Sequence, residues 1–473
     1  MDIHFSKLTL SKHVYACLML SLPFLAMSGC NLPDRAAEQR ANSYSETATA
    51  RSFEVEITKS VIDEISRLGL QTPVSGRLFV VLTNNPDREP RFQVGVSGVP
   101  FWGIDVQNIA AGDVITITPG MEDVRGYPFR YLDEVPNGTY TMQAVLSVYT
   151  EFQRSDGHTI SLHLNSGAGQ NQWRAPGNAY SQPTSFDHYT GETGAILFKI
   201  DSVIEPTQPL DDGDVLQQGN PVDTDFVKFV KIKSQVLSEF WGQDIYIGAN
   251  VLLPRDYDPS SSVKYPVMYM QGHFPGGRAP LGFTPEASGR GRSEGFSEFW
   301  TSESAPRMFA VSIRDANPYY DTAYSVNSAN VGPYGDAIME ELIPYLESEF
   351  NMIPESWARI VAGGSTGGWE AIAMQVFYPD DFGGSWGWCP DPVDFNYYQI
   401  VNIYEDDNAY TTGNEWHKVE RPNARRSDGN IRSTVRQENY LELATGSHSR
   451  SGGQWAIWEA VFGPVGEDGY PRP

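Results

Sequence analysis

The sequence predicts two folded parts, an all-β sandwich followed by a mainly parallel α/β sheet flanked by helices. Three observations predict this fold class. Short apolar runs separated by turn residues fill 52–204, as in sandwiches of short strands. A stretch rich in Pro, Gly and Asp follows at 205–225 and marks a linker. From 226 to 473, buried strand-like runs alternate with helical patterns, which indicates βαβ units.

The first 30 residues have the pattern of a signal peptide for export. Basic residues precede an apolar run at 14–27, which is too short and too poorly flanked to span a membrane. The Ser-Gly-Cys sequence that ends at Cys30 resembles the lipobox of bacterial lipoproteins, in which Cys30 would be lipidated. Met27 departs from the Leu or Val usual at that place, so cleavage without lipidation stays an alternative. We therefore expect an exported protein of the bacterial cell envelope, anchored to a membrane through lipidated Cys30.

The segment after the signal peptide and the net charge of the chain bear on which partners the protein can bind. Residues 31–51 are polar and predict a flexible tether without chemistry of its own. The chain has 34 basic and 59 acidic residues, a net charge of −25. A nucleic-acid partner requires a basic face, so the balance argues against one. The oligomeric state is not indicated.

Cysteine usage predicts no disulfide inside the folded parts. Cys17 and Cys30 belong to the N-terminal segment, which leaves Cys389 as the remaining thiol. Cys389 follows an apolar run, so we expect a buried structural cysteine rather than a reactive one.

The predicted sandwich rests on alternation of apolar and polar residues with little helical periodicity. Its strand-like runs lie at 53–57, 78–82, 92–96, 114–117, 140–149, 160–164 and 196–200, with Asn137-Gly138 as a turn signal. Trp102, Trp173 and Tyr180 are aromatic side chains of the kind that stack on sugars. The alternative, which we favour, is that they are core or loop aromatics of a structural module.

The second part shows strands at 226–232, 244–253, 265–270, 308–313 and 383–388, and helices at 336–350 and 368–377. Between the two helices, a short apolar run from Arg359 leads into Gly363-Gly364-Ser365-Thr366-Gly367, a Gly-x-Ser-x-Gly pattern. A sharp turn between strand and helix lifts a serine hydroxyl clear of the backbone. The pattern therefore makes Ser365 a candidate nucleophile.

Acyl transfer at a serine also needs N–H donors for the oxyanion. The backbone N–H of Thr366 is placed for this at the start of the helix, where the helix dipole helps. The second donor is expected from the turn after an earlier strand, at Gly272 or His273. For this turn a purely structural role is the alternative.

Four ordered segments carry a family resemblance: NVLLPRDY at 250–257, YPVMYMQGH at 265–273, GD to LIPY within 335–345, and VAGGSTGG at 361–368. Together they resemble the Putative esterase family of α/β-hydrolases, the group with esterase D-like and enterochelin esterase-like enzymes. The resemblance implies an α/β-hydrolase domain that cleaves carboxylic esters, with Ser365 at the nucleophile position and neither metal nor organic cofactor. Members of this kind often carry an N-terminal β-domain, which agrees with the sandwich predicted above.

The residues after Ser365 do not complete the expected site. In this fold the acid and the histidine follow the serine on later strands, yet the sequence after Asp391 shows no buried strand run. Asp391 is the candidate acid, although it comes one strand early and a substrate-side or loop role is the alternative. His448, in a loop of small residues, is the candidate base, and a surface role is its alternative; His417 is weaker still. We therefore expect the α/β-hydrolase domain to be C-terminally incomplete in this sequence.

Two functions remain open at this point. The first is a serine hydrolase that cleaves acyl or feruloyl polysaccharide esters or siderophore-like esters at the cell surface, through an acyl-enzyme. The second is a non-catalytic surface protein that binds a glycan or another ligand on a degenerate hydrolase scaffold.

Overall fold

The computed structural model describes residues 51–164, 168–206, 222–272, 279–284 and 292–472. The predicted signal peptide with Cys30, the tether up to residue 50, the middle of the linker and His273 lie outside these residues. Within the described ranges, no helix is both long enough and apolar enough to cross a membrane. The predictions on export and lipidation stay predictions.

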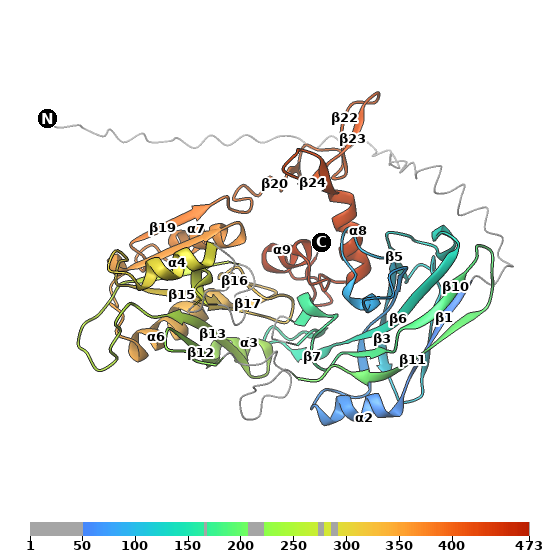
Figure 1. The fold of residues 1–473 in the computed structure, drawn as a ribbon, viewed down its shortest axis with the longest axis horizontal. Coiled ribbons are helices and arrows are strands. Elements are labelled where there is room, and N and C mark those ends of the chain that lie inside the picture. The colour runs from blue at the N-terminus through green and yellow to red at the C-terminus, as the bar shows by residue number, and fades with distance from the viewer. Residues whose placement is uncertain (1–50, 165–167, 207–221, 273–278, 285–291, 473) are drawn as a thin grey trace, which may run out of the picture. The chain divides into compact units, whose positions relative to one another are not determined.

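The first sheet contains nine strands from the N-terminal part of the chain (Figure 1). Its order is β4 (Val114–Ile117), β1 (Ser52–Ile57), β11 (Ala195–Val203), β9 (Ala179–Ser181), β6 (Gly138–Val148), β2 (Val74–Thr83), β3 (Phe101–Ile109) and β5 (Arg125–Tyr127), and β10 (Thr184–His188) also pairs with β6. Strand β1 forms because Phe53, Val55 and Ile57 alternate with polar residues and are fully buried. The β character of this part is as predicted, but its strands form one sheet and not two.

This single sheet curls over its own core. Strands β1 and β3 are separated by four strands in the sheet order, yet the rings of Phe53 and Trp102 lie 5.7 Å apart between centroids. Helix α2 (Lys59–Arg67) adds Val61 and Ile65 to the same core. Trp102 is fully buried, so it is a core aromatic and cannot stack on a sugar.

The second sheet has six strands in the order β12 (Val227–Ser234), β13 (Ile245–Leu252), β15 (Phe309–Arg314), β14 (Val267–Gln271), β18 (Arg359–Gly364) and β19 (Gly384–Trp388). The pairs from β15 to β19 are parallel, whereas β12, β13 and β15 pair antiparallel. The mainly parallel sheet predicted for this part is present. Parallel strands place their carboxyl ends at one edge, and Ser365 follows β18 at that edge.

Helices and small ribbons complete the second part. The helices are α3 (Gln235–Trp241), α4 (Arg292–Thr301), α5 (Tyr334–Asp336), a π-helical turn at Ala337–Leu342, α6 (Ile343–Glu349), α7 (Thr366–Phe377), α8 (Val435–Thr445) and α9 (Gln454–Phe462). Two-stranded ribbons pair β7 (Thr150–Gln153) with β8 (Thr159–Leu162), β16 (Asn327–Ser328) with β17 (Gly332–Pro333), β20 (Tyr397–Tyr398) with β21 (Val401–Asn402), β22 (Thr411–Gly413) with β23 (Lys418–Glu420), and β24 (Pro422–Arg425) with β25 (Ile431–Thr434). The ribbon β7–β8 packs into the core of the second sheet, where Phe152 meets Trp241 with ring centroids 5.1 Å apart.

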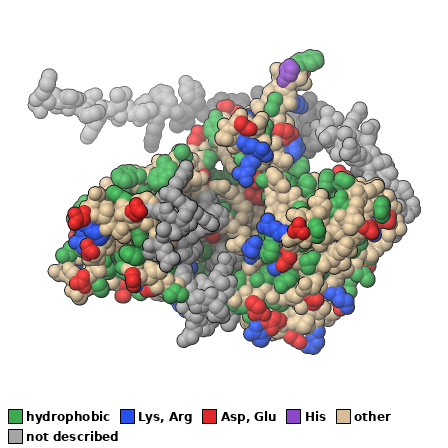
Figure 2. Space-filling model, in the orientation of Figure 1, with side chains coloured by type: hydrophobic (Ala, Val, Ile, Leu, Met, Phe, Trp, Pro, Cys, Tyr) green, Lys and Arg blue, Asp and Glu red, His purple; other side chains and the backbone are tan. Residues whose placement is uncertain are grey.

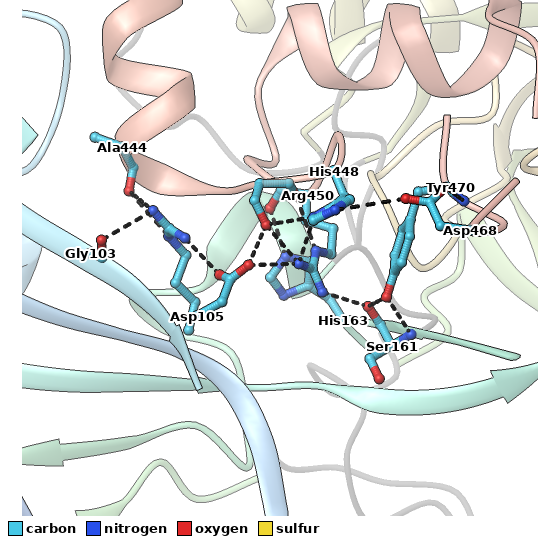
Figure 3. Close-up of polar contacts among 11 residues, drawn as sticks. Gly103, Asp105, Ser161, His163, Ala444, His448, Arg450, Asp468 and Tyr470 are labelled. Atoms are coloured by element: carbon cyan, nitrogen blue, oxygen red, sulfur yellow. Dashed lines mark hydrogen bonds and ion pairs between the residues drawn. The ribbon is translucent and has the colours of Figure 1, made fainter. Parts of the chain in front are cut away.

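A buried ion-pair cluster ties the C-terminal segment to the first sheet (Figure 3). Asp105 of β3 accepts hydrogen bonds from Arg77 Nη1 of β2 at 2.6 Å and from Arg450 Nη2 at 2.9 Å. Arg77 also donates to the carbonyl of Ala444 in α8 at 2.9 Å. Burial opposes ionisation of Asp105, but the two guanidinium groups and the Ser447 hydroxyl hold its pKa below the ordinary value. We call Arg77, Asp105 and Arg450 the arginine clamp.

Two further expectations are wrong. The run at 92–96 is not a strand, because Pro90 starts a short 3₁₀ turn that ends at Phe92 and the next residues follow as loop. Cys389 is exposed and not buried, because β19 is an edge strand of its sheet and the chain turns outward after it, with φ of +47° at Cys389.

Charge on the described surface is mixed. On the face that Figure 2 shows, Lys and Arg side chains are interspersed with Asp and Glu and do not form one continuous basic patch.

Candidate active site

Ser365 occupies a strained turn between β18 and α7. Its backbone has φ of +58° and ψ of −125°, a conformation that non-glycine residues rarely adopt. The Ser365 N–H donates to the carbonyl of Trp388 in β19 at 3.1 Å. Its carbonyl accepts the Gly368 N–H at 2.9 Å and so opens the helix. The strand, sharp turn and helix expected around this serine are all present.

Two glycines allow this turn to pack. A Cβ at Gly363 would lie 2.2 Å from the carbonyl oxygen of Gly367. A Cβ at Gly367 would lie 2.1 Å from the carbonyl oxygen of Gln271 and 2.8 Å from the nitrogen of Gly272. Any side chain would push α7 away from β14. Thr366 at the start of α7 and Gly272 at the end of β14 are therefore close neighbours of one turn, as the oxyanion hypothesis requires; His273 lies outside the described residues.

Asp391 lies beside Ser365. The Ser365 hydroxyl donates to Asp391 Oδ1 at 3.4 Å, a long contact. Three better donors hold Oδ2: the Thr366 hydroxyl at 2.7 Å, the Gln454 amide at 3.0 Å and the Tyr324 hydroxyl at 3.1 Å. These donors keep one oxygen occupied and leave the other facing Ser365. The structure thus brings the candidate acid to the candidate nucleophile.

Two buried carboxyl groups, those of Asp315 and Glu370, lie next to the loop that carries Tyr324. Asp315, just after β15, accepts the N–H of Ala323 at 2.9 Å and so holds the loop that carries Tyr324. The single hydroxyl proton of Thr322 cannot serve both Asp315, at 3.1 Å, and Glu370 of α7, at 2.9 Å. Burial raises the pKa of Asp315 to about 6. Burial and then the nearby Asp315 raise that of Glu370 well above its ordinary value. One of these carboxyl groups is therefore protonated near neutral pH and donates a hydrogen bond.

Ser365 opens into a cavity of about 680 Å³. Its wall includes Asp391, Tyr398, Gln454 and Trp458, besides the serine. The aromatic side is built by Trp458, whose ring stacks on Phe395 with centroids 5.7 Å apart. A volume of this size accepts a small organic group together with part of what it is attached to.

The structure does not bring His448 to Ser365. Its imidazole Nδ1 lies 2.9 Å from the Ser447 hydroxyl, and its ring lies 4.7 Å from that of Tyr470 between centroids (Figure 3). His448 lines a different cavity, beside the arginine clamp. Burial and the neighbouring Arg450 lower its pKa. The geometry therefore gives no support to His448 as the base for Ser365, because its loop is fastened to the first sheet.

The remaining described histidines lie elsewhere as well. His417 belongs to the tip of the exposed β22–β23 ribbon, and His163 is buried, with Nε2 2.9 Å from the carbonyl oxygen of Arg450. Among the described residues, none of the hydrogen bonds made by the Ser365 side chain goes to an imidazole. The same part of the chain contains no cluster of three or more His, Cys, Asp or Glu side chains able to hold a metal ion.

Residues 242–440 match the family model described as Putative esterase. Over that segment, the match confirms the resemblance that the four sequence motifs indicated. No curated protein matches the chain.

Several solved structures are similar to the chain. A ferulic acid esterase is 23% identical with a TM-score of 0.25, over 33% of this chain and 57% of that one. The CE1 ferulic acid esterase of Anaeromyces mucronatus is 17% identical with a TM-score of 0.24, over 37% and 64%. The S-formylglutathione hydrolase FrmB of Staphylococcus aureus is 17% identical with a TM-score of 0.21, over 33% and 54%. The chain thus spans less than two thirds of each of these proteins. Similarity this limited gives no information about its site.

Two residues at the site escape sequence reasoning. Tyr324 lies in a loop without a motif, and Gln454 is the first residue of α9. Both reach Asp391 from segments more than 60 residues away. The one available signal was the position of Gln454 at a helix start, behind a loop of small residues.

Proposed function

We propose that this protein is a serine esterase that cleaves carboxylic esters through an acyl-enzyme. The proposal is carried by the strained turn at Ser365, which lifts the hydroxyl at the carboxyl edge of the sheet inside the segment that matches the Putative esterase family. Ser365 Oγ attacks the ester carbonyl, and the N–H groups of Thr366 and of Gly272 or His273 hold the oxyanion. The alcohol leaves, and water then releases the acid from Ser365.

We assign Asp391 as the group that takes the proton from the Ser365 hydroxyl. It accepts the Oγ–H hydrogen bond, and it is the described carboxylate placed to receive that proton as the attack proceeds. Tyr324, Thr366 and Gln454 fix its orientation. This role replaces a base function of His448.

The proposed substrates are acyl or feruloyl esters of polysaccharides, or siderophore-like esters. The cavity at Ser365, with Tyr398 and Trp458 in its wall, has room for an aromatic acyl group.

A fluorophosphonate probe tests the nucleophile, because it forms a covalent bond with activated serines. We expect labelling of the natural full-length protein at Ser365 and turnover of 4-nitrophenyl acetate. Ser365→Ala should abolish both, whereas Ser66→Ala, at an exposed serine of α2, should change neither. Asp391→Asn should lower kcat/KM about a hundredfold. Equal turnover by Ser365→Ala would remove the assignment.

The second candidate, a non-catalytic surface protein that binds glycans or other ligands, is favoured by the lack of an imidazole at Ser365 among the described residues. It predicts that the natural protein neither reacts with the probe nor turns over esters.

We also propose that the protein is exported and held at a membrane by a lipid on Cys30. The support is the sequence pattern that ends at Cys30. Expression in a bacterial host with radioactive palmitate should label the natural protein and leave Cys30→Ala unlabelled and released from the membrane fraction. Equal labelling of both proteins would contradict the anchor.

A further inference from the structure

A second cavity, of about 330 Å³, adjoins the one at Ser365. Gln399, Asn423 and Gln454 line both cavities. The two therefore form one cleft, which leads from Ser365 past these three amides. The catalytic turn lies at one end of the cleft and the second cavity at the other.

The far end of the cleft is built by segments distant in the sequence. Trp173 and the loop at Val94 come from the part of the chain that forms the first sheet. Glu438 and Leu441 belong to α8, which the arginine clamp fastens to that sheet. Trp173 is itself held, since its ring lies 4.8 Å from that of Phe79 between centroids. This wall is thus fixed on a sheet core and does not rest on an isolated loop.

Two buried polar atoms of residues in the cleft wall lack hydrogen-bond partners within the described residues. They are the side-chain oxygen of Asn423 and the hydroxyl of Tyr398. A buried polar group without a partner costs about 1–3 kcal/mol, so two such groups in one wall call for an explanation. The terminal torsion of asparagine is soft, and a small rotation would present the Asn423 amide to a ligand in the cleft.

The backbone at Gln399, the residue after Tyr398, is strained and sets the direction of its side chain. It stands in the turn between β20 and β21 with φ of +52°, a conformation that costs a non-glycine residue free energy. The turn places this side chain in the wall of both cavities. An amide both donates and accepts hydrogen bonds.

The chemistry of the wall selects one class of ligand. Carboxyl groups of Asp391, Asp394 and Glu438 line the cleft, so a polyanionic ligand would meet like charge. Amides that donate and accept suit hydroxyl groups, which do both, and the rings of Trp173 and Trp455 offer flat apolar faces. This set fits a neutral chain rich in hydroxyl groups.

We propose that this cleft binds the alcohol part of the substrate, and that this part is a neutral oligosaccharide. The inference rests on the proposed function for the identity of the ester. It assigns Asn423, Gln399 and Tyr398 as residues that recognise sugar hydroxyls. The wall on the side of the first sheet then serves substrate binding and not only stability.

Binding without hydrolysis tests the proposal separately from catalysis. The full-length Ser365→Ala protein is titrated with unesterified xylo-, cello- and manno-hexaose while tryptophan fluorescence is followed. At least one of these sugars should bind and change the emission. In that background, Asn423→Ala and Gln399→Ala should each weaken binding about tenfold, the loss of one hydrogen bond. Gln107→Ala, at an exposed amide of β3, is the control and should bind as the parent does.

The thermal midpoint separates recognition from a structural role. Because the Asn423 oxygen has no partner, Asn423→Ala should unfold at the same temperature as the parent or a higher one. A lower midpoint would show that Asn423 serves the fold, and would overturn its assignment. Lack of binding of all three sugars to the parent would overturn the proposal even if ester turnover is observed. Ester turnover by Ser365→Ala would instead refute the proposed function and leave the binding result standing.

Discussion

At the scale of single residues, the contact between Gly367 and Gln271 decides whether the turn at Ser365 can form. Gly367→Ala would place a methyl group 2.1 Å from a backbone oxygen of β14. We expect a loss of about 2–3 kcal/mol in unfolding free energy, with loss of ester turnover. Gly384→Ala is the matched control, because an added Cβ there meets nothing within 4 Å. Urea unfolding of both variants measures the difference, and equal stability would contradict the packing argument.

The Thr366 hydroxyl gives a second prediction at this scale. It is the shortest of the hydrogen bonds to Asp391, at 2.7 Å, and valine has nearly the same shape. Thr366→Val should lower kcat/KM about tenfold, because the carboxylate loses one fixed donor. Thr301→Val, at the end of α4, removes a hydroxyl far from the site and should leave the rate unchanged. A rate for Thr366→Val within twofold of the natural protein would count against the proposed role of Asp391.

Sequence reasoning found the residues that share one local motif. Ser365 and Thr366 are fixed by the order strand, turn and helix, and Gly272 by the end of the neighbouring strand. Asp391 was the candidate acid with a substrate-side or loop role as its alternative, because it comes one strand early, and the structure places it beside Ser365. Tyr324 and Gln454 could not be found, because their approach to Asp391 depends on how distant segments fold back over the sheet. His448 lies away from Ser365, which fits its surface alternative, because its loop is held beside Arg450 of the clamp.

At the scale of elements, α8 caps the next helix. Glu442 of α8 accepts the backbone N–H groups of Trp455 at 3.0 Å and Ala456 at 2.9 Å, both in the first turn of α9. The residue before α9, Gly453, has no side chain for this task. Burial raises the pKa of Glu442 to about 7 in spite of these donors. The junction of the two helices therefore depends on a titrating group.

This pKa makes part of the stability depend on pH. The folded state binds the Glu442 proton more tightly than the unfolded state, so the contribution is complete below about pH 4.5 and is lost as pH rises through about 7. Glu442→Gln cannot ionise and removes that loss. Its stability relative to the natural protein should rise by about 3 kcal/mol between pH 4.5 and pH 8. Urea unfolding at the two pH values tests this, and a constant difference between the proteins would contradict it.

The predicted elements were most accurate where a whole strand is buried. Strands β13, β14, β15 and β18 lie close to their expected positions, because continuous apolar runs at the centre of a sheet have few alternatives. Helix α2 was overlooked although Val61, Ile65 and Leu68 repeat at helical spacing and are buried. The polar residues of this short helix give the segment the composition of a loop. The curl of the first sheet depends on contacts between strands far apart in the sheet order, which local alternation does not encode.

At the scale of the whole molecule, the arginine clamp holds two distant regions of the chain together. The guanidinium groups of Arg77 and Arg450 are buried on either side of the partly exposed Asp105, and removal of its charge would leave both without a counter-ion among the described residues. Asp105→Asn should therefore cost about 3–5 kcal/mol of stability. Asp63→Asn is the contrast, since it breaks the exposed pair with Lys59 in α2 and should leave the melting temperature unchanged. A small effect of Asp105→Asn would mean that apolar packing alone holds α8 on the sheet.

The clamp also sets an order of events during synthesis. Arg77 and Asp105 leave the ribosome more than 300 residues before Arg450 does. A nascent chain can thus complete the first sheet and the Ser365 turn while α8 and the amide of Gln454 are still missing. Until those residues emerge, Ser365 lacks the wall that we assign to sugar recognition. A chain released before Arg450 and Gln454 are made would therefore lack both the clamp and the Gln454 hydrogen bond to Asp391.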